Sequence, residues 1–122
     1  LNVLEEVVNI LFYIAEADGH LSKEEEAMIA NIAFIFGLNQ KQYESIKESR
    51  KSSDKLNPYI VLESQPTDDL KSIRKKYIKL SKEHHPDLLI SKGVPNEVIN
   101  ESKNKMRAIN AAWDQIQKLK SS

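Results

Sequence analysis

The sequence contains no cysteine, which excludes a disulfide framework and any chemistry that needs a thiolate. It also lacks an apolar run near the ~20 residues that a membrane-spanning helix needs. It has no glycine-rich segment and no cluster of aromatic residues of the kind that binds single-stranded nucleic acid. No stretch alternates between apolar and polar residues as a half-buried strand does. Together with the helical periodicity described below, these absences predict an all-α fold.

Net charge is also absent, because 18 basic residues balance 18 acidic ones. The two kinds of charge are unevenly distributed. Residues 1–50 hold nine acidic and four basic side chains (9 − 4, five negative), whereas residues 51–122 hold nine acidic and fourteen basic ones (14 − 9, five positive). This division predicts two units with different partners, the second attracted to an acidic surface.

Apolar residues recur at helical spacing in three segments of the first unit, which we expect to form helices over about 1–17, 23–36 and 39–49. Ser22 and Glu25 fit a capping box before the second helix. Gly19 and Gly37 follow the first and second helices, where glycine tolerates a left-handed backbone. The polar stretch after residue 50 has no period, and we interpret residues 51–57 as a linker between domains at 1–50 and 58–122.

The second unit is predicted to contain a short helix and a long antiparallel helical hairpin. Pro58 suits the first turn of the short helix. Thr67 is a candidate N-cap for a long helix with Asp68 and Asp69 in its first turn. Pro86 must end that helix, because it disfavours helical geometry at the preceding residue and has no N–H to donate. A last helix is expected over about 96–120.

The tripeptide His85-Pro86-Asp87 lies where the two long helices turn. The helix before it carries six basic and no acidic residues over 70–82. Each feature alone has an ordinary explanation: the tripeptide could be a helix stop and a turn, and lysines commonly cover a solvated helix face. Their combination at one end of a hairpin is more specific.

The combination resembles the J-domain of the DnaJ family of co-chaperones, over about residues 58–120. Tyr59, Leu62 and Tyr77, and residues 109–113 on the return helix, fall where J-domains carry such residue types. The resemblance implies binding to the ATPase domain of an Hsp70 (DnaK-type) chaperone and faster ATP hydrolysis there, with no catalysis and no cofactor in this chain. The residues that it implies for Hsp70 binding are His85, Pro86, Asp87, Lys71, Arg74, Lys75, Tyr77, Lys79 and Lys82.

Residues 81–87 and 91–95 are similar to the DjlA-like group of bacterial co-chaperones, with a double histidine before Pro-Asp and a Lys-Gly-x-Pro loop after it. Residues 17–21, 24–26 and 36–38 resemble the second repeat of a TerB-like (tellurite-resistance) domain, which this group carries before its J-domain. The chain starts at Leu1 and holds about half of such a domain, so we expect a piece of a longer protein. The resemblance implies an inner-membrane anchor in that protein, with these domains in the cytoplasm.

Three residues depart from the J-domain pattern. Ile78 replaces a frequent basic residue, Leu88 replaces a basic residue or asparagine, and Glu63 replaces a glycine after the short helix. None belongs to the tripeptide, but Ile78 and Leu88 leave the strength of the Hsp70 contact open.

Two alternative functions remain to be weighed against the co-chaperone. A helical nucleic-acid binder could use the basic face of the long helix, although the chain as a whole is neutral and has no base-reading motif. A hydrolase could use His84, His85 and Asp87. No nucleophile or oxyanion-hole motif accompanies these three residues, and His84 falls on the apolar stripe, where a packed, hydrogen-bonded histidine is expected.

A metal-responsive module is the third alternative, because the loop around Asp18 resembles part of a calcium-binding loop. Glu16, Asp18, Ser22 and Glu25 fall on ligand positions of an EF-hand frame. The first position of that frame is Ile14, which cannot bind calcium. Helix capping explains these residues more simply, so no metal ligand is predicted.

Overall fold

A computed structural model of the chain describes residues 3–17 and 19–121, with the side chains of all of these except Val3 and Leu88. Asp18, from the calcium alternative, therefore lies outside the described residues. The described residues form seven helices and no strand, which confirms the all-α prediction. The helices are α1 (Val3–Ala15), α2 (Lys23–Ile35), α3 (Gln40–Ser49), α4 (Pro58–Val61), α5 (Leu70–His84), α6 (Asp87–Ile90) and α7 (Asn96–Ser121).

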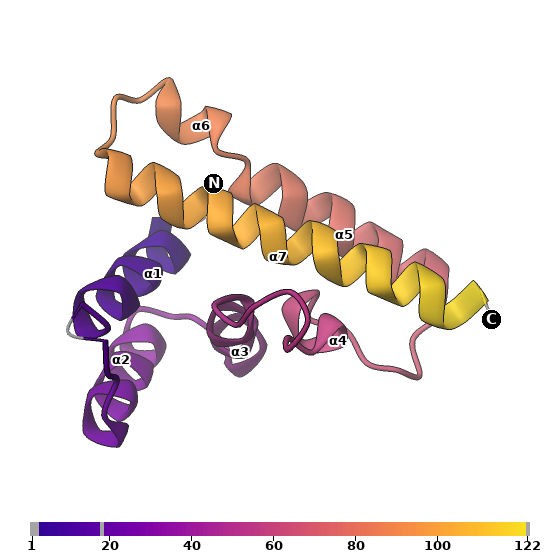
Figure 1. Cartoon of the computed structure of the whole chain (residues 1–122), viewed down its shortest axis with the longest axis horizontal. Helices are drawn as coiled ribbons and strands as arrows, with labels where there is room; N and C mark the ends of the chain where they lie inside the picture. Colours follow the sequence, from indigo (N-terminus) through magenta and orange to yellow (C-terminus); the bar gives the residue numbers. More distant parts are fainter. Residues whose placement is uncertain (1–2, 18, 122) are drawn as a thin grey trace.

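The dominant feature is the antiparallel hairpin of α5 and α7, with α6 in the connection at one end (Figure 1). The hairpin is closed by an apolar core to which α5 contributes Ile73 and Leu80 and α7 contributes Ile109 and Ile116, all buried. Helix α4 completes the core with Val61. Because both long helices present one apolar stripe, the opposite face of α5 is left to solvent.

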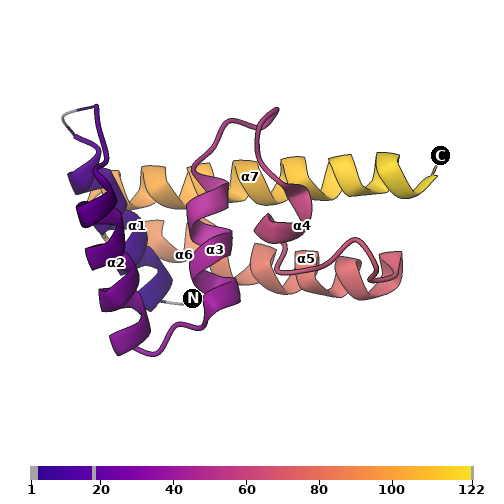
Figure 2. The same ribbon diagram turned by 90° about the horizontal axis from the view of Figure 1, so that it is seen from below.

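Helices α1, α2 and α3 pack beside the half of the hairpin that carries α6, and α3 crosses α7 (Figures 1 and 2). They enclose a second apolar core around Phe12, Ala33 and Ile46. The two cores are separate, and polar side chains fill the boundary between them. Met28 of α2 and Phe36, the residue directly after this helix, are 61% and 58% exposed.

Helix ends follow local chemistry, with one correction. Ser22 and Glu25 form the predicted capping box, and Gly37 has the expected positive φ of 97°. The prediction of Thr67 as the N-cap of α5 is wrong: Asp69 takes that position, and its carboxylate accepts a hydrogen bond of 2.7 Å from the Ser72 N–H. Asp68 instead accepts from the Gln65 N–H and closes the turn before the helix.

Candidate functional site

The tripeptide 85–87 forms a sharp tip between α5 and α6. His84 is the last residue of α5, and His85 has an extended backbone with φ −66° and ψ 126°. This is the geometry that a following proline imposes, because the ring of Pro86 disfavours helical geometry at His85. Pro86 then lies at the start of α6, and Asp87 is its first residue. The local sequence therefore sets the direction change at the tip.

The polar groups of the tip face solvent. The side chains of His85 and Asp87 are 53% and 82% exposed, with 3.6 Å between His85 Nδ1 and Asp87 Oδ2. The Asp87 N–H donates to the same Nδ1 over 3.3 Å. Together with Ser81 and Lys82, these two residues line an open depression of about 450 Å³. A partner can therefore reach the tip directly.

The inner side of the tip is tied to α7. Leu89 of α6 is 3% exposed. The hydroxyl of Ser102 in α7 donates a buried 2.7 Å hydrogen bond to the carbonyl oxygen of His84. Pro86 cannot donate to the carbonyls at the end of α5, so a side-chain donor at this place stabilises the helix end. The tip is thus anchored to α7 on its inner side and exposed to solvent on its outer side.

A continuous positive face runs along α5 toward the tip. All of its members are exposed, and none makes an ion pair with another described residue: Lys71, Arg74, Lys75, Lys79 and Lys82. We call these five residues the basic face. Ile78 lies among them at 37% exposure. Because none of these five charges forms an ion pair within the part of the chain that the structure describes, they are available to an acidic surface.

Tyr77 lies beside the basic face but points toward α7. Its ring stacks on the indole of Trp113, and its hydroxyl donates to Asn110 Oδ1 over 3.0 Å. Both rings are only partly buried and pack against the hairpin core. Among the sequence-predicted binding residues, Tyr77 is the one with an evident packing role.

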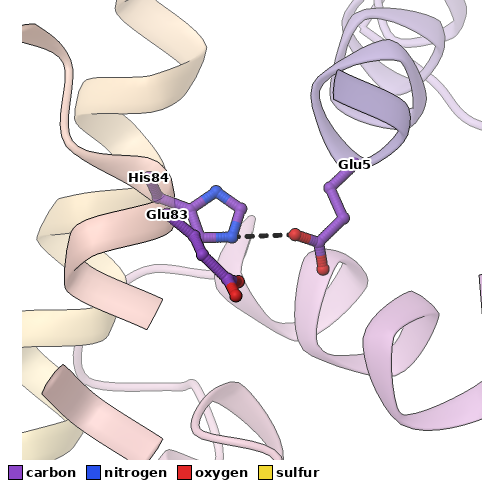
Figure 3. Close-up of side chains that lie close together, drawn as sticks. All are labelled: Glu5, Glu83 and His84. Atoms are coloured by element: carbon purple, nitrogen blue, oxygen red, sulfur yellow. Dashed lines mark ion pairs between the residues drawn. The ribbon is translucent and has the colours of Figure 1, made fainter. Parts of the chain in front are cut away.

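His84 lies in a polar cluster that the sequence did not reveal. It is fully buried, as expected from the apolar stripe, but its two ring nitrogens face carboxylates of α1. Nε2 lies 2.9 Å from Glu5 Oε2 (Figure 3), and Nδ1 lies 3.2 Å from Glu6 Oε1. Burial lowers the pKa of His84, but the two carboxylates outweigh this effect and raise it above its ordinary value.

Glu5, Glu83 and His84 bring potential metal-ligand atoms within 4.8 Å of one another (Figure 3). A metal ion would need a free lone pair on the imidazole. Both ring nitrogens already face carboxylate oxygens at ion-pair distance. We therefore interpret the cluster as an ion pair rather than as a metal centre.

Two further basic residues lie at the boundary between the two cores. Lys105 of α7 is 2% exposed, and its ammonium donates to the hydroxyls of Ser45 and Ser49 in α3. Burial lowers the pKa of Lys105 to about 8. Arg50 pairs with Glu101 of α7 at 2.6 Å. Sequence reasoning places lysine and arginine on the surface, so nothing in the pattern marked Lys105 as buried or Arg50 as partly buried.

Two family models match different parts of the chain. A family model described as DnaJ domain matches residues 57–121, and one described as tellurite resistance protein TerB matches residues 2–48. No solved structure gives a significant match. No described helix is both long and apolar enough to cross a membrane.

Several curated relatives carry the name co-chaperone protein DjlA. The relative from Vibrio parahaemolyticus is 34% identical over 92% of this chain and 43% of its own length. One from Vibrio vulnificus is 33% identical over 92% and 44%, and one from Escherichia coli K12 is 28% identical over 93% and 50%. The chain thus spans about half the length of the relatives it matches. The DnaJ-domain model matches more than half of the residues and follows the TerB match in the sequence. The chain therefore belongs to the DnaJ-domain family and is similar to the DjlA co-chaperones.

Proposed function

We propose that this chain is the J-domain portion of a co-chaperone that docks onto the ATPase domain of an Hsp70 (DnaK-type) chaperone and accelerates its ATP hydrolysis. The observation that carries the proposal is the exposed His85-Pro86-Asp87 tip at the end of a basic face that makes no ion pair among the described residues. The DnaJ-domain match over the same residues supports it.

The basic face and the tip have different roles in this proposal. Each exposed ion pair between the basic face and an acidic groove contributes only about 0.2–1 kcal/mol, so the face sets orientation and association rate more than affinity. The tip supplies directional contacts: the imidazole of His85 donates or accepts, and the carboxylate of Asp87 accepts. The complex is therefore transient and weakened by salt.

The chain itself carries out no chemistry in this proposal. His84 is buried and already paired with Glu5 and Glu6, so it is not accessible to a substrate. His85 and Asp87 lie on an open surface without an accompanying nucleophile or oxyanion hole. Acceleration instead comes from a shift in the conformational equilibrium of the partner, which requires different contacts with its two states. No cofactor takes part.

We further propose the domain limits 1–50 for the TerB-like segment, 51–57 for the linker and 58–122 for the J-domain. In the full-length protein, the similarity to DjlA suggests an inner-membrane anchor elsewhere in the chain and a cytoplasmic location for these residues. The hydrophobic side chains left exposed on α2 and directly after it, such as Met28 and Phe36, are available to the remainder of the TerB-like domain.

Single-turnover ATP hydrolysis by a bacterial Hsp70, with and without the chain, tests this function. We expect the rate to rise with chain concentration to a plateau, and the half-maximal concentration to increase with salt. A parallel titration with duplex DNA at low salt tests the nucleic-acid alternative. Absence of ATPase stimulation together with salt-sensitive DNA binding would replace the proposed function with that alternative.

A further inference from the structure

Helix α1 contacts the J-domain hairpin at the residue directly before the tip. Glu5 and Glu6 come from α1, and His84 ends α5, so segments 78 positions apart meet in one buried contact. Figure 3 shows the side chain of Glu5 extending from α1 toward the His84 ring. Glu5, Glu6 and His84 are 1%, 4% and 0% exposed.

We infer that Glu5 and Glu6 are positioning residues for the tip, because they hold His84 as an imidazolium and so make the orientation of residues 85–87 depend on the first unit. This inference rests on the proposed function of the tip and extends it to a mode of regulation. We call the contact of Glu5, Glu6 and His84 the α1 clamp.

The geometry favours a proton on both ring nitrogens: Nδ1 is hydrogen-bonded to Glu6, and Nε2 lies at ion-pair distance from Glu5 without a hydrogen bond. A neutral imidazole has one N–H and one lone pair, so it would place a lone pair against one of the two carboxylates. Nε2 and Nδ1 lie 2.9 and 3.2 Å from carboxylate oxygens, and repulsion at these distances in a buried site is costly. With both carboxylates ionised, only the imidazolium attracts both Glu5 and Glu6.

The other charged groups around His84 modify this preference without reversing it. From α7, the ammonium of Lys105 opposes protonation of His84. Lys105 in turn is held by Ser45 and Ser49 and attracted by Glu5, Glu6, Glu63 and Glu83. Glu83 lies beside His84 in α5 and within the same cluster. The carboxylates around His84 therefore outnumber the ammonium.

The clamp is well placed to act on the tip. The carbonyl of His84 is fixed by Ser102, so its side chain and main chain are held from two different helices. Glu6, Val7 and Ile10 of α1 also line an apolar pocket of about 210 Å³ with Leu89 of α6. Both ends of the short connection 85–87 are therefore bordered by α1. Loss of the clamp frees the His84 side chain and leaves the Ser102 hydrogen bond alone to hold the end of α5.

The pH dependence follows from the raised pKa of His84. A group whose pKa is higher in the folded state than in the unfolded state stabilises the fold below its unfolded value and loses this contribution as pH rises through the folded value. The unfolded value for histidine is about 6.5. The clamp is therefore fully formed below about pH 6.5, and it opens as pH rises through the higher pKa that His84 has in the folded protein.

The test compares the full chain with the double variant Glu5→Gln and Glu6→Gln, which keeps side-chain size and removes both charges. The matched control is Glu16→Gln, because Glu16 pairs with Arg50 and has no contact with His84. NMR spectra report the backbone amides of residues 85 and 87 and the ring nitrogens of His84, which is one of three histidines and can be assigned with His84→Gln. Because the Asp87 N–H donates to His85 Nδ1, each protein is also measured with His85→Gln, which leaves His84 as the histidine next to the tip. Single-turnover Hsp70 hydrolysis is measured from about pH 6 to about pH 9.

In the wild type, we expect the two tip amides to shift with the same midpoint as the His84 ring. In the double variant, the tip amides should differ from the wild type at low pH, and the half-maximal concentration for ATPase stimulation should rise about tenfold. The difference between the two proteins should shrink as pH rises, while Glu16→Gln behaves as the wild type. Glu5 and Glu6 also attract Lys105, so the titration of Lys105 changes in the double variant as well. The ring nitrogens of His84 therefore identify which titration the tip amides follow.

Tip amides that do not follow the His84 ring in the wild type would overturn the inference, even where the double variant fails to fold. A folded double variant with wild-type tip amides and wild-type stimulation at low pH would do the same. If the wild type stimulates no Hsp70 at any pH, the proposed function fails, whereas the NMR titration still decides whether α1 positions the tip.

Discussion

The phenol ring of Tyr77 lies nearly parallel to the indole ring of Trp113, with 5.2 Å between centroids and 11° between planes. This stack joins α5 to α7, and the Tyr77 hydroxyl adds a hydrogen bond to Asn110. Tyr77 is therefore held by the return helix on the side away from the basic face. Its contribution to function should be that of a residue that keeps the hairpin closed.

Tyr77→Phe should retain the stack and lose only an exposed hydrogen bond, lowering the unfolding free energy by about 0.5–1 kcal/mol. Tyr77→Ala should lower it by about 2–3 kcal/mol, because burial and stacking are both lost. Urea unfolding measures both changes. A Tyr77→Phe protein that keeps its stability but no longer stimulates Hsp70 would instead make the hydroxyl a partner contact.

Among the described residues, Glu63 is the only residue other than glycine that has a positive φ, which is 54°. A side chain in this left-handed region costs about 1–2 kcal/mol. Glu63 is also partly buried, and burial and Glu5 raise the pKa of its carboxyl. Glu63→Gly should therefore increase the unfolding free energy by about 1 kcal/mol.

Glu63→Ala is the control for this change, because it removes the carboxylate and keeps the Cβ. We expect it to gain less than the glycine variant in urea unfolding. Equal stabilisation by alanine and glycine would assign the effect to the charge and not to the backbone.

Lys105 is buried with a pKa lowered to about 8. Between about 8 and the unfolded value of about 10.4, the unfolded chain binds more protons than the folded one, so the unfolding free energy from Lys105 rises with pH. Lys105→Met should abolish this rise. The Ser45 and Ser49 hydroxyls keep their carbonyl acceptors, Val61 and Ser45, so this variant should lie within about 1 kcal/mol of the wild type at neutral pH.

Lys105→Ala should be less stable by about 2–4 kcal/mol, because it leaves a cavity between α3 and α7. Unfolding curves at neutral and alkaline pH distinguish the two variants. An alkaline rise that persists unchanged in Lys105→Met would show that another group causes it.

Ile78 interrupts the basic face at 37% exposure. Ile78→Lys adds a charge between Lys75 and Lys79, and an exposed ion pair with the partner should lower the half-maximal concentration for stimulation by up to about fivefold at low salt. Ile78→Gln is the uncharged control. A lower half-maximal concentration that is the same at high salt would contradict an electrostatic origin.

The sequence predicts the features of this fold that depend on neighbouring residues. The capping box of Ser22 and Glu25, the glycine after α2 and the helix stop at Pro86 all act within a few positions. The N-cap of α5 shows the limit of such local prediction: Thr67 was predicted, but Asp69 takes the position, because several adjacent residues could cap this helix equally well. Helix α6 is only one turn long, so it is too short for a periodic pattern to predict it.

The boundary between the two cores could not be predicted. His84 meets Glu5 and Glu6 across most of the chain, and Lys105 meets Ser45 and Ser49 in the same way. Helical periodicity predicts that a residue is buried, but it does not identify the distant side chain that it contacts. His84 could be recognised as packed, whereas its partners became visible only in three dimensions.

Asp87→Asn gives the most direct test of the central claim, that the exposed tip accelerates ATP hydrolysis by another protein. The substitution keeps the size of the side chain and removes its charge at a position that is 82% exposed, so the helical circular dichroism signal should not change. Asp114→Asn, an exposed carboxylate of α7 far along the hairpin, is the matched control. In single-turnover hydrolysis by a bacterial Hsp70, Asp87→Asn should give no acceleration and Asp114→Asn should equal the wild type. Full acceleration by a folded Asp87→Asn protein would contradict the account.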